Sequence, residues 1–169
     1  MDYARRGDDR QAPRAAPVNY LTFNVNRLLM ACPVDVVAEV MGPQPILPVA
    51  EAPPYLQGAI RVHRRLIAVL SLRCMLGMPA RPLNRRNSIL LVRIGRGSRA
   101  VLAGLLVDSV SELALITPDQ VRLAAHAPAG MRSGLVMGTV RIRGRLTRLI
   151  DVNALLTSEE LSRLTLVAA

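Results

Sequence analysis

Short apolar segments separated by turn residues run along the chain from residue 19 onward. Most of them alternate apolar and polar positions or form a brief continuous apolar run, and both patterns are typical of β-strands. The predicted strands lie at residues 19–25, 28–32, 58–72, 88–94, 100–107 and 138–152, where 58–72 and 138–152 each contain a pair. Extended helical periodicity is missing from these segments. The pattern therefore predicts a mainly β protein and argues against a helical bundle or a doubly wound sheet.

Short helices and one long loop interrupt this β pattern. VDVVAEV at residues 34–40 has valines at helix-like spacing and is expected to form a short helical segment. Prolines crowd residues 43–54, so this crossing is expected to be an ordered loop. Near the end of the chain, Thr157 and Glu160 have the spacing of a capping box, which predicts a C-terminal helix over residues 157–167.

The chain contains an internal duplication. VDVVAEV at residues 34–40 is matched by VDSVSEL at 107–113, and GAIRVHRRLIAVLSL at 58–72 is matched by GTVRIRGRLTRLIDV at 138–152. The copies keep their order, and only the length of the connecting loops changes, as expected of a repeated unit. A unit of about five short strands cannot bury both faces of an open sheet, so we expect each copy to close into a small barrel.

The domain limits follow from this repeat. Residues 1–18 are polar and contain proline, and they are expected to form a disordered tail. The remainder, 19–169, is then one domain. Within it we expect two intertwined barrel subdomains, roughly 28–87 and 88–154 with flanking strands, packed side by side and followed by the helix at 157–167.

Composition raises the question of a charged partner. The 169 residues are 51% hydrophobic, which is enough for a sizeable core, and they carry 22 arginines, no lysine and 12 acids, a formal net charge of +10. This excess suggests nucleic acid or an anionic membrane as a partner, and it is equally compatible with the base composition of the gene. No signal-peptide pattern opens the chain and no apolar run reaches the length of a membrane span, so we expect a cytoplasmic protein.

Patterns of catalytic chemistry are missing from the sequence. Neither histidine stands at a metal-ligand spacing from cysteine or acidic residues, and the two cysteines lack a CxxC spacing. The nucleophile-elbow and phosphate-binding-loop patterns are also absent. We therefore expect no catalytic residue, no metal and no cofactor.

The order of the motifs resembles that of the CheW-like adaptor family. The matching segments are YLTFNV, CPVDVVAEVMG, LPVAEAPPYLQGAIRV, LLVDSVSELALITPDQV and GLVMGTVRIRGRLTRLIDVNALLTSEEL, which cover roughly Tyr20 to Leu164. The resemblance implies two five-stranded SH3-like barrels and a scaffold without enzymatic activity. It also implies two partners: the cytoplasmic tip of a methyl-accepting chemoreceptor, and the regulatory domain of a chemotaxis-type histidine kinase. Contact with the membrane would be indirect, through the receptor.

The same resemblance implies a receptor-binding groove between the barrels. Its residues in this chain would be Val37, Glu39, His63, Ile89, Val110 and Leu113. Apolar periodicity also predicts burial, so Ile89, Val110 and Leu113 are equally candidates for the core. Glu39 is the firmest assignment, because an acid after an apolar run has no place in a core.

His63 departs from the family pattern. It stands where family members carry an arginine that contacts the receptor, and imidazole lacks the permanent charge and the donor fork of a guanidinium. We therefore expect a specialised adaptor, for example in pilus motility or development, in place of flagellar chemotaxis.

A basic β-barrel that binds nucleic acid is the alternative function. Arg141, Arg143 and Arg145 alternate in the sequence and are expected to line one strand face, where they would track phosphates. Aromatic residues, on which bases stack, make up only 2% of the chain. This scarcity argues against the alternative, and we expect no nucleic-acid partner.

Overall fold

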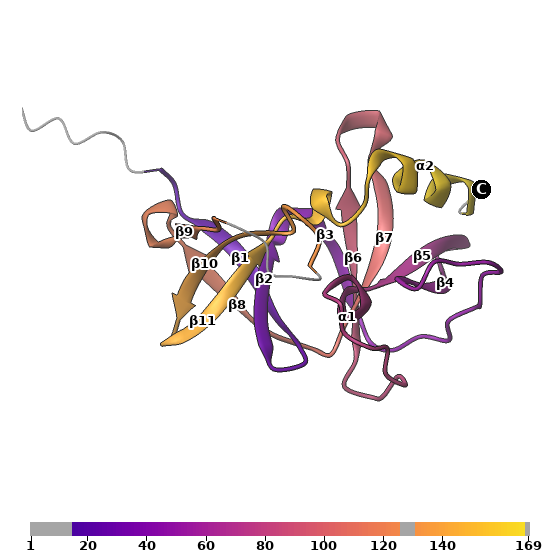
Figure 1. Ribbon diagram of the computed structural model, residues 1–169, viewed down its shortest axis with the longest axis horizontal. Coiled ribbons are helices and arrows are strands. Elements are labelled where there is room, and N and C mark those ends of the chain that lie inside the picture. The colour runs from indigo at the N-terminus through magenta and orange to yellow at the C-terminus, as the bar shows by residue number, and fades with distance from the viewer. Residues whose placement is uncertain (1–14, 126–130, 168–169) are drawn as a thin grey trace, which may run out of the picture.

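Two β-sheets lie side by side, and a C-terminal helix packs on one of them (Figure 1). The computed structural model describes residues 15–125 and 131–167, and the side chains of 165–167 are not described. Most of the predicted tail, residues 1–14, lies outside the described residues, and Val18 already begins the first strand.

Eleven strands and two α-helices make up the regular structure of the described residues. The strands are β1 (Val18–Val25), β2 (Leu28–Pro33), β3 (Val37–Met41), β4 (Leu56–Val62), β5 (Arg65–Ser71), β6 (Ser88–Ile94), β7 (Val101–Val107), β8 (Ser109–Ile116), β9 (Arg122–Leu123), β10 (Val136–Ile142) and β11 (Arg145–Ile150). The helices are α1 (Leu72–Met75) and α2 (Ser158–Val167), and short 3₁₀ turns join several strands. The mainly β class and the strand pairs predicted from the sequence are confirmed.

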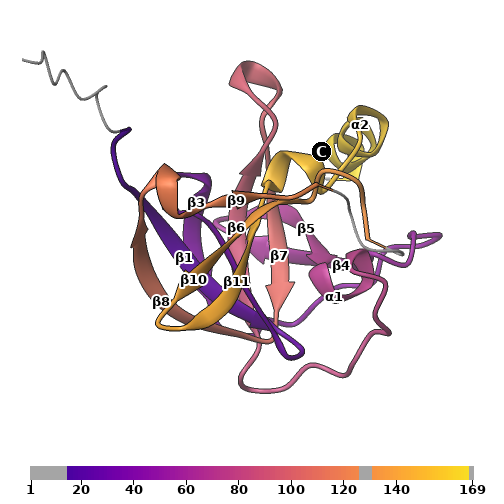
Figure 2. The ribbon, with the colours of Figure 1, turned by 60° about the vertical axis from the view of Figure 1, so that its left-hand side comes forward.

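The strands divide into two sheets. The first sheet has the order β8-β1-β2-β11-β10-β9, and the second has the order β3-β6-β7-β5-β4. Neighbours pair antiparallel except for β2 with β11 and β5 with β7, which are parallel. The turn between β6 and β7 extends beyond the rest of the second sheet in both views (Figures 1 and 2).

Each sheet mixes the two repeats. The β1–β2 hairpin of the first repeat pairs with the β10–β11 hairpin of the second, and β6–β7 of the second pairs with β4–β5 of the first. The expected subdomain limits need correction, because residues 28–87 and 88–154 each contribute strands to both sheets. The physical reason is the parallel pairing of β2 with β11 and of β5 with β7, which joins hairpins far apart in the sequence.

The register confirms the duplication. The β4–β5 ladder shifts between Leu56 and Gly58, and the β10–β11 ladder shifts at the equivalent residues, Val136 and Gly138. A Cβ on Gly58 would lie 2.3 Å from the carbonyl oxygen of Leu47, and one on Gly138 would lie 2.6 Å from that of Arg122. A neighbouring backbone therefore crosses close to both positions, which explains why both copies carry glycine there.

The expected helix at residues 34–40 is wrong for most of its length. Only Val34–Val36 forms a single 3₁₀ turn, and the chain then continues as β3, with Val37 opposite Val92 of β6. β-branched side chains fit a pleated surface well, and here the free edge of β6 offers the pairing partner. The equivalent segment after Val107 is likewise a strand, β8.

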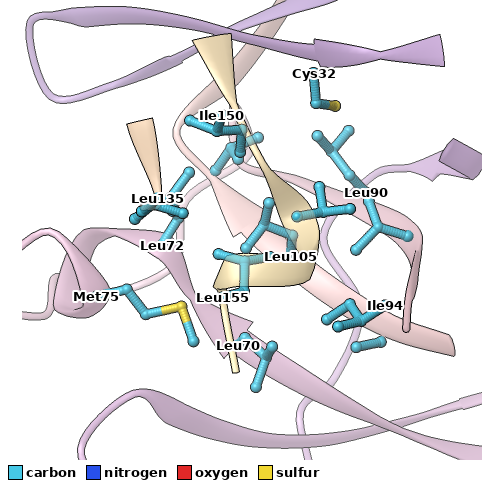
Figure 3. Packing of buried hydrophobic residues seen from close by; sticks show 14 of the residues in the cluster. Cys32, Leu70, Leu72, Met75, Leu90, Ile94, Leu105, Leu135, Ile150 and Leu155 are labelled. Atoms are coloured by element: carbon cyan, nitrogen blue, oxygen red, sulfur yellow. The ribbon is translucent and has the colours of Figure 1, made fainter. Parts of the chain in front are cut away.

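The main core lies between the sheets. Figure 3 shows Cys32 from β2 and Ile150 from β11 on one side, with Leu90 from β6 and Leu105 from β7 facing them. All four are fully or almost fully buried. Each buried side chain of Leu or Ile size contributes roughly 1.5–3 kcal/mol, so this shared core holds the two sheets together.

Helix α2 begins with the predicted capping box. The Thr157 N–H donates to the Glu160 carboxylate over 2.7 Å, and the Glu160 N–H donates to the Thr157 hydroxyl over 3.2 Å. Arg132 holds the same carboxylate with two hydrogen bonds of 2.6 and 2.8 Å, and its guanidinium lies 5.2 Å from the centre of the Tyr55 ring. Leu164, on the inner face of α2, is buried in the main core, and α2 lies against β5 and β7 of the second sheet. Arg132 ties the start of the helix to the segment before β10.

Candidate partner-binding site

Two edge strands, β3 of the second sheet and β8 of the first, border a small surface depression. We call this depression the edge groove. It has a volume of about 210 Å³ and is lined by Leu21, Val34, Val37, Ala38, Glu39, Val40 and Leu113. Apolar side chains therefore face solvent where the free edges of the two sheets come together, with one carboxylate among them.

Three of the residues predicted for the groove are brought together in it: Val37, Glu39 and Leu113. Val37 is half-buried, Glu39 is exposed, and the Leu113 side chain is 64% exposed. The prediction missed Val40, which is also exposed and lines the groove. The repeat carried the missing signal, because Val40 in VDVVAEV is the counterpart of Leu113 in VDSVSEL.

Ile89 has to be removed from the residues that touch a partner. Its side chain is 0% exposed and packs with Ile60 and Val69 in a cluster inside the second sheet. It lies opposite Met41 in the β3–β6 ladder, and neither residue lines the groove. Val110 is half-buried, packs against the main core and does not line the groove. For both residues, apolar periodicity indicated packing.

His63 and Glu39 lie next to each other although they are far apart in the sequence. The imidazole Nε2 of His63 is 3.9 Å from a carboxylate oxygen of Glu39, and both side chains are largely exposed. His63 and Arg64 form the β4–β5 turn with φ values of 46° and 66°. A two-residue turn with two positive φ values favours Asn-Gly, so the backbone conformation is energetically costly for His63 and Arg64. In this turn the His63 side chain lies beside Glu39 of β3.

The first sheet repeats this arrangement. Arg143, in the β10–β11 turn, lies 3.1 Å from the carboxylate of Glu112 on β8. Glu112 is the repeat counterpart of Glu39, and Arg143 is the counterpart of His63. In each sheet an edge strand is thus joined to the turn of a distant hairpin by an acid and a base. Exposed ion pairs of this kind contribute little to the stability of the fold. Because water reaches these side chains, a partner protein can also contact their charges.

The predicted arginine stripe is not formed. Strand β10 ends at Ile142, so Arg143 is a turn residue bound to Glu112. Arg141 lies opposite Leu146 and Arg145 lies opposite Ile142, which places Arg141 and Arg145 on opposite faces of the ladder. The guanidinium of Arg141 also donates to the Gly144 carbonyl oxygen over 3.0 Å. The alternation that suggested phosphate tracking spans a turn and not a strand.

The described residues also bear on chemistry. They contain no group of three or more His, Cys, Asp or Glu side chains able to hold a metal ion. Burial raises the pKa of the Cys32 thiol to about 12, which keeps it protonated and unreactive. Neither α-helix in the described ranges has the length and apolar character of a membrane span.

Comparisons with known proteins give these features a family context. A model of the CheW-like domain matches residues 19–160. Proteins named chemotaxis protein CheW are similar: that of Rhizobium meliloti is 24% identical over 140 residues, 83% of this chain and 88% of the relative. That of Thermotoga maritima is 28% identical over 137 residues, 80% of this chain and 85% of the relative.

A solved structure shares the fold. The crystal structure of scaffolding protein TtCheW from Thermoanaerobacter tengcongensis matches with a TM-score of 0.75 at 22% identity, over 85% of this chain and 97% of that chain. This likeness confirms the expected fold of two SH3-like barrels.

Proposed function

The chain belongs to the CheW-like domain family, and from this premise we propose that it is a scaffold without catalytic activity, which couples a chemoreceptor to a chemotaxis-type histidine kinase. The names of the relatives, chemotaxis protein CheW, and of the structural neighbour, a scaffolding protein, support a role in chemotaxis-type signalling. The observation that carries the proposal is the edge groove, where Val37, Glu39 and Leu113 meet at the surface.

The receptor partner would be a helical hairpin, bound by its apolar face. Val37, Val40 and Leu113 offer aliphatic contacts on a rigid β scaffold, as helix-in-groove recognition requires. The His63–Glu39 pair at the rim would set register and select among receptors through charge. Because histidine replaces the family's arginine, we propose a receptor different from that of flagellar chemotaxis, as in pilus motility or development.

The kinase partner would be the regulatory domain, which is homologous to the adaptor and would dock barrel to barrel. A complex of this kind needs no cofactor and no bond chemistry. It would assemble in the cytoplasm and reach the membrane only through the receptor.

A pair of matched variants tests the groove. Leu113→Asp places a charge in the edge groove, whereas Leu115→Asp places the same charge two residues along β8 at a side chain that is equally exposed but outside the groove. Receptor and kinase are first identified by affinity purification from the native host. Binding of the receptor fragment is then measured by calorimetry, and we expect Leu113→Asp to weaken it at least tenfold while Leu115→Asp does not. Equal losses for the two variants would refute the groove as the receptor site.

A further inference from the structure

A second cavity, which we call the junction cavity, lies apart from the edge groove and shares none of its lining residues. Its volume is about 330 Å³. Its walls come from the β1–β2 turn, the start of α1, the irregular segment 77–87 and the link between β7 and β8. Three arginines line it, Arg73, Arg81 and Arg86, and Asp108 is the one acid in its lining.

Arg73 and Asp108 form the floor of the junction cavity. The Arg73 side chain is only 8% exposed, and its Nη2 donates to a carboxylate oxygen of Asp108 over 2.7 Å. The same oxygen accepts the Asn26 N–H over 2.5 Å, so Asp108 joins Arg73 to the β1–β2 turn. A guanidinium has five N–H groups. Its remaining ones have no protein partner in the described part of the chain.

These remaining N–H groups are open to the cavity. No buried side-chain nitrogen or oxygen among the described residues lacks a hydrogen-bond partner. The free donors of Arg73 must therefore reach solvent, and Arg73 lines the junction cavity. These N–H groups of a nearly buried cation are available to a ligand in the cavity, where charge-assisted hydrogen bonds are strong.

Arg81 and Arg86 add positive charge at the rim. Both are exposed, and in the described ranges neither has an acidic partner. With Asp108 neutralising one arginine, the cavity keeps two uncompensated positive charges. The segment that carries Arg86 is held in place, because Arg86 N–H donates to the Asn84 side chain over 2.8 Å and Asn87 donates to the Val107 carbonyl oxygen over 3.1 Å. These bonds fix the backbone that carries Arg86 beside the cavity.

We propose that the junction cavity binds a phosphate group, carried either by inorganic phosphate or by a small phosphorylated molecule. Guanidinium forks match phosphate oxygens in pairs, and charge-assisted hydrogen bonds to them are short and strong. The side-chain amides of Asn26 and Gln57, which also line the cavity, offer neutral donors. Because Asn26 follows a strand of the first sheet and Gln57 belongs to the second, the bound anion fastens the two sheets to each other.

The test uses the full chain and inorganic phosphate as the probe. Thermal unfolding and calorimetry are recorded with phosphate and with sodium chloride at equal ionic strength. We expect phosphate to raise the Tm in a saturable way, since a ligand bound only to the folded state stabilises it. Arg81→Gln and Arg86→Gln each lower the affinity about tenfold. Arg85→Gln removes a neighbouring exposed arginine that does not line the cavity and leaves the affinity unchanged.

A parallel titration with adenosine monophosphate separates the two sources. Tighter binding of the nucleotide identifies a small phosphorylated molecule, and equal or weaker binding identifies free phosphate. In the wild-type chain, backbone amide shifts on phosphate addition are expected at Asn26 and within residues 81–87. An equal Tm rise with chloride, amide shifts only elsewhere, or an equal loss of affinity in Arg85→Gln would overturn the proposal.

Discussion

Replacement of Glu160 by glutamine tests how α2 is held. The carboxylate receives two hydrogen bonds from Arg132, of 2.6 and 2.8 Å, and one from the Thr157 N–H. The hydrogen bonds from Arg132 are the largest cause of the low pKa of Glu160, about 2 against an ordinary 4.5. A displacement of this size corresponds to about 3 kcal/mol of stability at neutral pH. The Arg132 side chain is 28% exposed and that of Glu160 is 19% exposed, and solvent screening therefore reduces this contribution to stability.

We therefore expect Glu160→Gln to lower the free energy of unfolding by about 2 kcal/mol at pH 7, measured by urea denaturation. Because the folded-state pKa lies below the unfolded one, the contribution is complete above about pH 4.5 and is lost as the pH falls through about 2. The difference between wild type and variant should shrink over the same window. The matched control is Glu159→Gln, which breaks the exposed pair with Arg163 on the same helix and should cost at most about 0.5 kcal/mol.

Two results would refute this reasoning. One is an equal cost for Glu159→Gln and Glu160→Gln at pH 7. The other is a difference between wild type and Glu160→Gln that stays constant down to pH 2. Either result would mean that the clamp seen around Glu160 contributes no more than a surface ion pair.

The remaining predictions concern the repeat glycine and the groove rim. Gly58→Ala should cost more than about 2 kcal/mol in thermal unfolding, because its Cβ would meet a backbone oxygen at 2.3 Å, whereas Gly42→Ala, with nothing within 4 Å, should cost little. Glu39→Arg should weaken receptor binding in a pull-down and leave the Tm nearly unchanged, so loss of folding would show that Glu39 is structural. His63→Arg should change the preference among several receptors, and an unchanged preference would dismiss His63 as a selector.

Much of the fold was predictable from local pattern. Alternation and turn chemistry depend on neighbouring residues, so they predicted the hairpin at residues 19–32 and the capping box of Thr157. The duplication was found because the order of motifs repeats along the chain. The groove residues Val37, Glu39 and Leu113 were found because the family resemblance supplied their positions.

Two of the errors share one physical cause, which is that periodicity reports a buried face without naming its partner. The helix expected at residues 34–40 is a strand because β6 offers a free edge to Val37. Ile89 is apolar because it packs inside the second sheet, and nothing in its own segment distinguishes this from a groove wall. The arginine stripe failed because the turn at Arg143 reverses the chain within the run. Partner strands far away in the sequence decide the first two outcomes, whereas the local turn between β10 and β11 decides the third.

The reciprocal sharing of hairpins between the sheets has a consequence for the origin of the molecule. A chain with a single repeat would contribute only some strands of each sheet, and its exposed strand edges would be completed by a second identical chain that offers the missing hairpins. The progenitor of this protein is then expected to have been a hairpin-swapped homodimer with two-fold symmetry. Fusion of two such subunits into one polypeptide would free each copy to diverge, in keeping with histidine at position 63 and arginine at the equivalent position 143.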